Sequence, residues 1–211
     1  NTFREETLYT LEVEAVFRNN LRSLHAVFEG YAGAGPTGQP DLMSLPEWLS
    51  LCTHLDLFDR EFTPREAALA FQWSRMKAVD EVKGRSRLLN VSFIDFFEAL
   101  MRMAMSKRLP TPDILRKAGR RTAGEYYLEL RRAPSDVYNS YLETHAQACV
   151  ASGDKVGMRA HMALEALLSV VISSIRGFAS HGAATDLTVS EVESFMRTQG
   201  EKMREGKLAG G

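Results

Sequence analysis

The stretch Phe93-Ile94-Asp95-Phe96-Phe97-Glu98-Ala99-Leu100 decides the fold class of this chain. Its apolar residues recur at steps of three and four and continue through Met101 and Ala104, which is the spacing of one face of an amphipathic helix. The same spacing returns in nearly all the other periodic segments. No segment sustains the alternation of apolar and polar residues that marks a half-buried strand. The sequence therefore predicts an all-α protein.

Start signals precede several of these helical segments. Ser44 and Glu47 form a capping box, in which each side chain satisfies a backbone N–H group of the other residue. The stretch Thr63-Pro64-Arg65-Glu66 combines a capping box with Pro at the first helical position. We expect the first of these helices to end near His54 and the second to continue to about Val79.

Further helices are expected on both sides of this pair. Upstream, apolar residues form one helical stripe from Val13 to Tyr31, which the Gly- and Pro-rich stretch Gly33–Pro40 terminates. Thr111-Pro112 can cap another start. Downstream, the periodicity predicts helices over Ser135–Ala151, Lys155–Phe178 and Val189–Met203, the last behind the capping box Thr188…Glu191.

The composition excludes several classes of protein. The 211 residues include 26 Lys+Arg and 27 Asp+Glu, with 45% hydrophobic residues, as in an ordinary globular protein and unlike a disordered, collagen-like or disulfide-rich chain. A dedicated nucleic-acid binder normally carries a basic surplus, which is absent here. The longest apolar run, Met162 to Ile175, contains Glu165 and is shorter than the roughly 20 residues that span a bilayer, so it predicts a buried helix.

The cysteines and the first residue of the chain each predict something about the protein: its redox compartment and whether it is part of a longer chain. Cys52 and Cys149 lie in apolar surroundings, which predicts two buried free thiols in a reducing, cytoplasmic compartment. The chain begins at Asn1 and not at Met, which is typical of a piece of a longer protein.

The two successive helix–loop–helix units can be aligned with a pair of EF-hands. An EF-hand loop has twelve positions, of which the eighth is apolar and pairs with its counterpart in the partner loop, and the twelfth binds calcium through a carboxylate. Met43 and Glu47 fit positions eight and twelve of the first loop. Val91 and Asp95 fit the same positions of the second. The frame therefore fits twice.

The calcium ligands of such loops are missing. Calcium needs six to eight oxygen ligands, several of them charged. Positions one, three and five are Pro36, Gly38 and Pro40 in the first loop and Gly84, Ser86 and Leu88 in the second, with Arg85 and Arg87 between them. We therefore predict that neither loop binds calcium and that the chain holds no metal or cofactor.

The first half of the chain resembles the degenerate, paired EF-hand segments of flagellated-protist proteins, many of which are axonemal or cytoskeletal. The resemblance covers about residues 10 to 112. It rests on Leu45-Pro46-Glu47-Trp48, on Phe71-Gln72-Trp73-Ser74-Arg75-Met76 with Val79-Asp80-Glu81, and on Phe93 to Leu100. It implies a protein-interaction module in a flagellar axoneme or in the cytoskeleton.

The sequence offers little support for catalysis. Nucleophile motifs, a phosphate-binding Gly loop and a dinucleotide fingerprint are all absent. His145 and Cys149 stand four residues apart on one helix face, but no second pair completes a set of four metal ligands. We therefore expect a non-enzymatic protein.

These observations combine into a division of the chain and a function. We expect a degenerate EF-hand pair at residues 1–110, a basic connecting segment at 111–134 and a C-terminal helical bundle or extension at 135–211. The function predicted is a calcium-independent structural adaptor that holds a helix or peptide of a partner protein in a groove. The residues predicted to line the core or groove of the pair are Phe28, Trp48, Phe71, Trp73, Phe93, Phe96, Phe97 and Met101.

Two alternatives stay open at this point. The first is a calcium-regulated sensor, or the regulatory part of a larger enzyme. The second is a binder of acidic surfaces, such as a tubulin tail or an RNA backbone, through the residues Arg116, Lys117, Arg120 and Arg121. Against the second, a solvated helix face with arginines paired to Glu125 and Glu129 explains the same segment.

Overall fold

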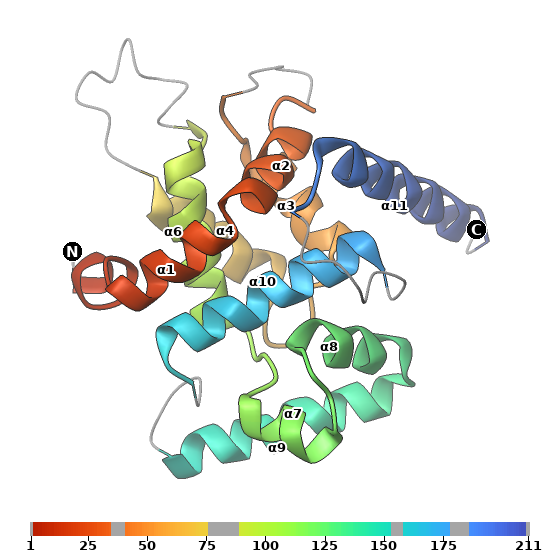
Figure 1. The fold of residues 1–211 in the computed structure, drawn as a ribbon. Coiled ribbons are helices and arrows are strands. Elements are labelled where there is room, and N and C mark those ends of the chain that lie inside the picture. Colours follow the sequence, from red (N-terminus) through yellow and green to blue (C-terminus); the bar gives the residue numbers. More distant parts are fainter. Residues whose placement is uncertain (1, 35–40, 76–88, 153–157, 178–185, 210–211) are drawn as a thin grey trace.

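The computed structural model describes residues 2–34, 41–75, 89–152, 158–177 and 186–209, except for the side chains of 146–152 and 206–209. Within these ranges no residue belongs to a β-strand, and the prediction of an all-α protein is confirmed. The elements (Figure 1) are a short π-helix, η1 (Arg4–Leu8), and the α-helices α1 (Leu11–Asn19), α2 (Leu21–Tyr31), α3 (Leu45–His54), α4 (Pro64–Ser74), α6 (Phe93–Ser106), α7 (Pro112–Ala118), α8 (Ala123–Arg132), α9 (Ser135–Ser152), α10 (Ala160–Arg176) and α11 (Val189–Ala209).

The central helix of the fold is α10, which crosses the middle of the molecule in Figure 1. It packs against α1, α6, α8 and α11. Eight of its 17 residues are buried, all of them between Met162 and Ile175, and Glu165 is exposed, which confirms the buried helix predicted there. Within the ranges described, no helix is both long and apolar enough to cross a membrane.

A glycine sets the close approach of α8 to α10. A Cβ added at Gly124 would lie 2.3 Å from the carbonyl oxygen of Ser169, so any larger residue would force the two helices apart. The N–H group of Gly124 donates to the Ser169 hydroxyl at 3.0 Å. This packing holds α8 in place, so that its last turn lies beside the C-terminal end of α10.

Most of the predicted helix starts are confirmed. The capping boxes at Ser44, Thr63 and Thr188 are all formed, each with the Glu three residues later accepting hydrogen bonds. Pro64 occupies the first helical position of α4, and α3 ends at His54 as expected. These local signals depend on neighbouring residues only, which is why the sequence locates them well.

Several predicted helices differ in extent: α10 begins at Ala160 and not at Lys155, and α11 continues past Met203 to Ala209. The stripe from Val13 to Tyr31 forms two helices, α1 and α2, and the prediction of one continuous helix is wrong. The break lies at Asn20, whose side-chain amide donates to the carbonyl oxygen of Val16 at 2.8 Å and so competes with the backbone for helical hydrogen bonds. Helix α4 ends at Ser74, and residues 76–79, through which the prediction carried it, lie outside the described residues.

The two helix–loop–helix units meet at a backbone pairing. The N–H group of Met43 donates to the carbonyl oxygen of Val91 at 2.8 Å, and the N–H group of Val91 donates back at 2.9 Å. Both side chains are fully buried. These are the residues that the loop alignment places at position eight. The pairing brings the starts of α3 and α6 together, and α4 packs against both helices.

Buried side chains from residues 1–110, 111–134 and 135–211 belong to one hydrophobic cluster. Polar contacts also join these segments. The hydroxyl of Tyr127 donates to the carbonyl oxygen of Asp56 at 2.9 Å, and the hydroxyl of Tyr138 donates to the carboxylate of Asp59 at 2.8 Å. The C-terminal helices therefore share a core with the N-terminal helix–loop–helix units.

Candidate functional site

The carboxylates aligned with position twelve act as helix caps. The N–H group and hydroxyl of Ser44 donate to one oxygen of Glu47 at 2.7 and 2.8 Å. Ser92 and Asp95 repeat the arrangement at 2.9 and 2.8 Å. The second box was missed at the sequence level, although Ser followed three residues later by an acid is its signature. Both carboxylates are buried among the residues of the helix starts.

The residues aligned with the other calcium-ligand positions fall outside the part of the chain that the structure describes. These are Pro36, Gly38, Pro40, Gly84, Ser86 and Leu88, and the same holds for Arg85 and Arg87. Among the residues that are described, no group of three or more His, Cys, Asp or Glu side chains is arranged to hold a metal ion.

The apolar residues predicted to line the core or groove differ in how deeply they are buried. Five of the eight predicted residues are buried in the core, namely Phe28, Trp48, Phe71, Phe96 and Met101. Phe93 and Phe97 are partly buried against that core, and Trp73 is 60% exposed. Phe28 and Phe93 also line a hollow of about 330 Å³, and Phe97 lines an apolar groove.

An apolar groove lies between the N-terminal helices and α6. Its volume is about 420 Å³, and its floor is formed by Phe17 and Phe97, whose rings stack with centroids 4.6 Å apart. Tyr9, Leu21 and Ile94 line it and are 65%, 44% and 64% exposed. Exposed large apolar side chains that gather at one place often mark an interaction surface.

Charged residues at this groove are paired with one another. The buried carboxylate of Glu98 accepts a hydrogen bond from Arg4 at 2.7 Å and two from Arg102 at 3.0 and 2.7 Å. The contact with Arg4 ties η1 to α6, and Glu98 itself lines the groove. Glu14 and Arg18 form a second pair, at 2.5 Å, on the exposed face of α1. The groove therefore offers mainly apolar side chains to a ligand.

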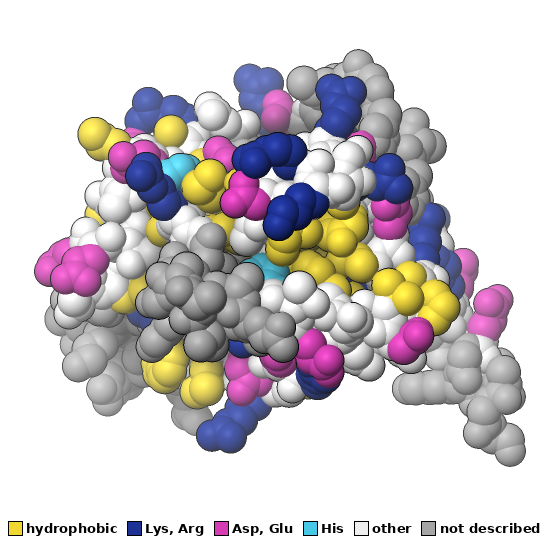
Figure 2. Space-filling view, turned by 90° about the horizontal axis from the view of Figure 1, so that it is seen from below, with side chains coloured by type: hydrophobic (Ala, Val, Ile, Leu, Met, Phe, Trp, Pro, Cys, Tyr) yellow, Lys and Arg dark blue, Asp and Glu magenta, His cyan; other side chains and the backbone are white. Residues whose placement is uncertain are grey.

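The predicted acidic-surface residues lie on α7 and in the turn that follows it. Arg116 pairs with Asp113, and Arg120 pairs with Glu129, both at 2.7 Å. Lys117 and Arg121 are exposed. In Figure 2, which shows the molecule from below, Lys and Arg side chains lie beside Asp and Glu side chains and do not form one continuous basic patch on this face.

The remaining sequence-level candidates have structural contacts. His145 is buried, and its Nε2 atom lies 2.6 Å from the carbonyl oxygen of Leu109. Cys52 is a buried free thiol, as predicted, and burial raises its pKa above the ordinary range. The side chain of Cys149 lies outside the described residues.

Comparison with known proteins gives no match. No protein-family model, curated protein or solved structure is significantly similar to the chain. The site is therefore interpreted from its own residues.

Proposed function

We propose that the chain is a non-catalytic protein-interaction module whose two helix–loop–helix units pair in the EF-hand manner without calcium. The observation that carries the proposal is the apolar groove, in which Tyr9, Leu21 and Ile94 remain exposed beside a stacked aromatic floor. Keeping such side chains in water is unfavourable, and contact with an apolar partner removes that cost.

The occupant proposed is an amphipathic helix of a partner protein. Helices bound in grooves insert apolar side chains from one face, spaced three and four residues apart. The paired charges of Glu14 with Arg18 and of Glu98 with Arg4 place little uncompensated charge along the groove. An occupant with an apolar face and uncharged polar flanks complements this surface. The sequence resemblance directs the search for it to axonemal and cytoskeletal proteins.

Calcium independence is proposed from the state of the two position-twelve carboxylates. Glu47 and Asp95 are hydrogen-bonded to Ser44 and Ser92, and calcium binding would require each to leave its cap. With Pro and Gly at ligand positions of the first loop and two arginines in the second, few oxygens would replace the lost hydrogen bonds. The module is thus proposed to act as a constant adaptor.

Calcium titration tests this part of the proposal. We expect no heat of binding at micromolar calcium in isothermal titration calorimetry. Glu47→Ala should instead lower the free energy of unfolding by about 1 kcal/mol, because it removes half of a capping box. Glu193→Ala, at an exposed position of α11, is the control and should change stability very little. Micromolar calcium binding that Glu47→Gln or Asp95→Asn abolishes would contradict calcium independence.

A matched pair of charge substitutions tests the groove. Ile94→Asp places a carboxylate among the groove's apolar side chains and should weaken partner binding by about tenfold or more. Leu11→Asp is the control. Like Ile94, Leu11 is an exposed apolar residue in the first turn of a helix, but it does not line the groove. Both variants should fold, since neither side chain is buried.

The measurement starts with partners recovered on the wild-type chain from the cells of origin, and then compares their affinities for the purified variants. Loss of binding with Ile94→Asp alone supports the groove. Equal affinities for wild type and Ile94→Asp, or equal losses in both variants, would exclude this groove as the docking site.

A further inference from the structure

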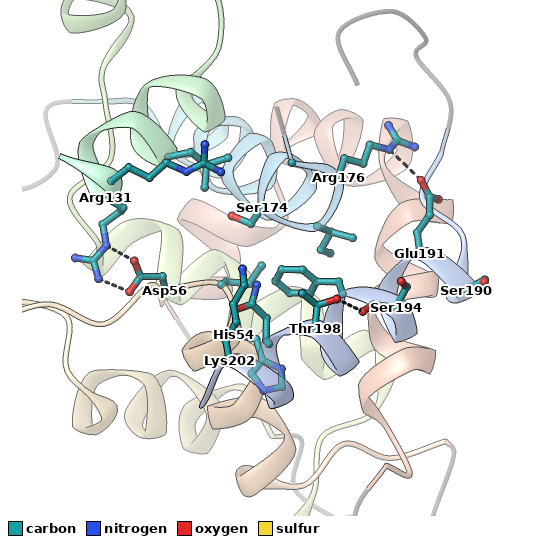
Figure 3. A pocket seen from close by; sticks show the side chains of 17 residues that line it. His54, Asp56, Arg131, Ser174, Arg176, Ser190, Glu191, Ser194, Thr198 and Lys202 are labelled. Carbon is teal, nitrogen blue, oxygen red and sulfur yellow. Dashed lines mark hydrogen bonds and ion pairs between the residues drawn. The ribbon is translucent and has the colours of Figure 1, made fainter. Parts of the chain in front are cut away.

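A second hollow lies on another part of the molecule and shares no lining residue with the apolar groove. It has a volume of about 660 Å³, within the range of small-molecule sites. Its walls are the C-terminal ends of α8 and α10, the part of α11 from Ser190 to Lys202 and the residues around the end of α3 (Figure 3). We call it the polar pocket.

Positive charge exceeds negative charge around the polar pocket. Its lining includes four basic side chains, Arg131, Arg132, Arg176 and Lys202, and two carboxylates, Asp56 and Glu191. The excess is therefore two positive charges. This differs from the near-neutral chain as a whole, which carries a formal charge of −1.

Both carboxylates already have partners. Asp56 forms a two-point contact with Arg131, whose guanidinium also donates to the carbonyl oxygen of Phe58 at 3.2 Å. Glu191 accepts hydrogen bonds from the N–H group and hydroxyl of Thr188 at 2.7 and 2.8 Å, and these bonds, with the charge of Arg176, hold its pKa below the usual range. Both carboxylates are thus engaged in contacts within the protein, and the four basic side chains of the lining still outnumber them.

The cations stand on opposite sides of the pocket. In Figure 3, the Arg131–Asp56 pair and the Arg176–Glu191 pair face each other across it, and Lys202 lies between them in this view. The contact of Arg176 with Glu191 is 3.5 Å long and made through Nε. Arg132 and Lys202 line the pocket and are exposed.

A buried hydroxyl supplies a second, independent observation. The Oγ atom of Ser174 is buried and has no hydrogen-bond partner among the described residues. It belongs to the pocket lining and lies between the two ion pairs in Figure 3. A buried polar atom without a partner is unfavourable, and a water or ion bound beside it is one of the recognised explanations.

We infer that the polar pocket binds a small anion with at least two negative charges on phosphate-type or carboxylate-type oxygens. Guanidinium groups match such oxygens in pairs, a Lys ammonium adds a point charge, and the Ser174 hydroxyl donates to an oxygen that enters the pocket. The site is independent of the groove and of its proposed partner helix. No covalent step is involved.

Calorimetric titration with sodium pyrophosphate at low salt tests the inference on the full chain. We expect saturable binding that weakens by about tenfold in Lys202→Ala and in Arg132→Ala, since each removes a charge-assisted contact. Lys117→Ala and Arg121→Ala remove exposed cations outside the pocket and are the matched controls, with unchanged affinity expected.

Ser174→Ala separates the site from a general electrostatic effect. It should weaken pyrophosphate binding and raise the melting temperature of the ligand-free chain, because it removes the buried hydroxyl that lacks a partner. Citrate in parallel titrations distinguishes a carboxylate ligand from a phosphate ligand. Absence of saturable binding of both anions, or equal losses in pocket and control variants, would overturn the inference.

Discussion

Trp48→Ala is expected to lower the free energy of unfolding by about 3–5 kcal/mol, the usual cost of truncating a buried Trp. The side chain is completely buried, and its ring lies edge-on to that of Phe96 with centroids 6.0 Å apart. Its Nε1–H group donates to the carbonyl oxygen of Ala67 at 2.9 Å. Because these contacts join α3, α4 and α6, the substitution leaves a cavity and removes a buried hydrogen bond where the two units meet.

The other tryptophan is the matched control. Trp73 is 60% exposed, so Trp73→Ala should change the free energy of unfolding by less than about 0.5 kcal/mol. Urea denaturation followed by circular dichroism measures both values. Similar losses for the two variants would mean that Trp48 does not hold the helix–loop–helix units together.

Lys107→Met should destabilise the fold by about 3–5 kcal/mol, because it leaves the buried carboxylate of Asp59 without its counterion. The Lys107 side chain is fully buried and the Asp59 side chain is 5% exposed, with 2.7 Å between Nζ and Oδ2. Asp59 also accepts hydrogen bonds from the N–H group of Phe62 at 2.7 Å and from the hydroxyl of Tyr138 at 2.8 Å. The pair thus joins the end of α6 to α9 within one network.

A double variant separates the loss of charge pairing from the loss of packing. Lys107→Met with Asp59→Asn removes both charges and keeps an oxygen acceptor for the N–H group of Phe62, so it should recover part of the stability lost in Lys107→Met alone. Chemical denaturation of the wild type, both single variants and the double variant measures the coupling. A double variant as unstable as the sum of the singles would show that the two charges do not interact.

The same pair predicts a dependence of stability on pH. Burial by itself raises the pKa of Asp59, but the charge of Lys107 and the hydrogen bonds to the carboxylate outweigh burial and hold the pKa below its usual value. The resulting stability is fully present above about pH 4, the pKa of an unfolded Asp, and is lost as the pH falls through the folded pKa. Asp59→Asn should remove this part of the acid dependence.

Part of the fold was predictable because its signals are local. The boxes at Ser44, Thr63 and Thr188 depend on residues three apart, and the apolar run of α10 identifies a buried helix without reference to any neighbour. The break at Asn20 was not predicted, since a polar residue on the exposed side of an apolar stripe fits a continuous helix equally well.

The candidate sites were less predictable than the fold. Periodicity places Trp48 and Trp73 on helices but does not say which side chain another element will cover, and one is buried while the other is exposed. The basic segment 111–134 was identified from composition. That its residues Arg131 and Arg132 line a pocket depends on the packing of α8 beside α10 and α11.

The sequence by itself determined the helical class, most of the helix starts and the residues Met43 and Val91 that pair between the two loops. Tertiary structure alone decided which apolar residues form the core or the groove, that Lys107 lies against Asp59, and that cations from α8, α10 and α11 surround one pocket. The physical reason is that capping and periodicity act within a few residues. Burial, ion pairing and pockets instead depend on contacts between residues far apart in the chain.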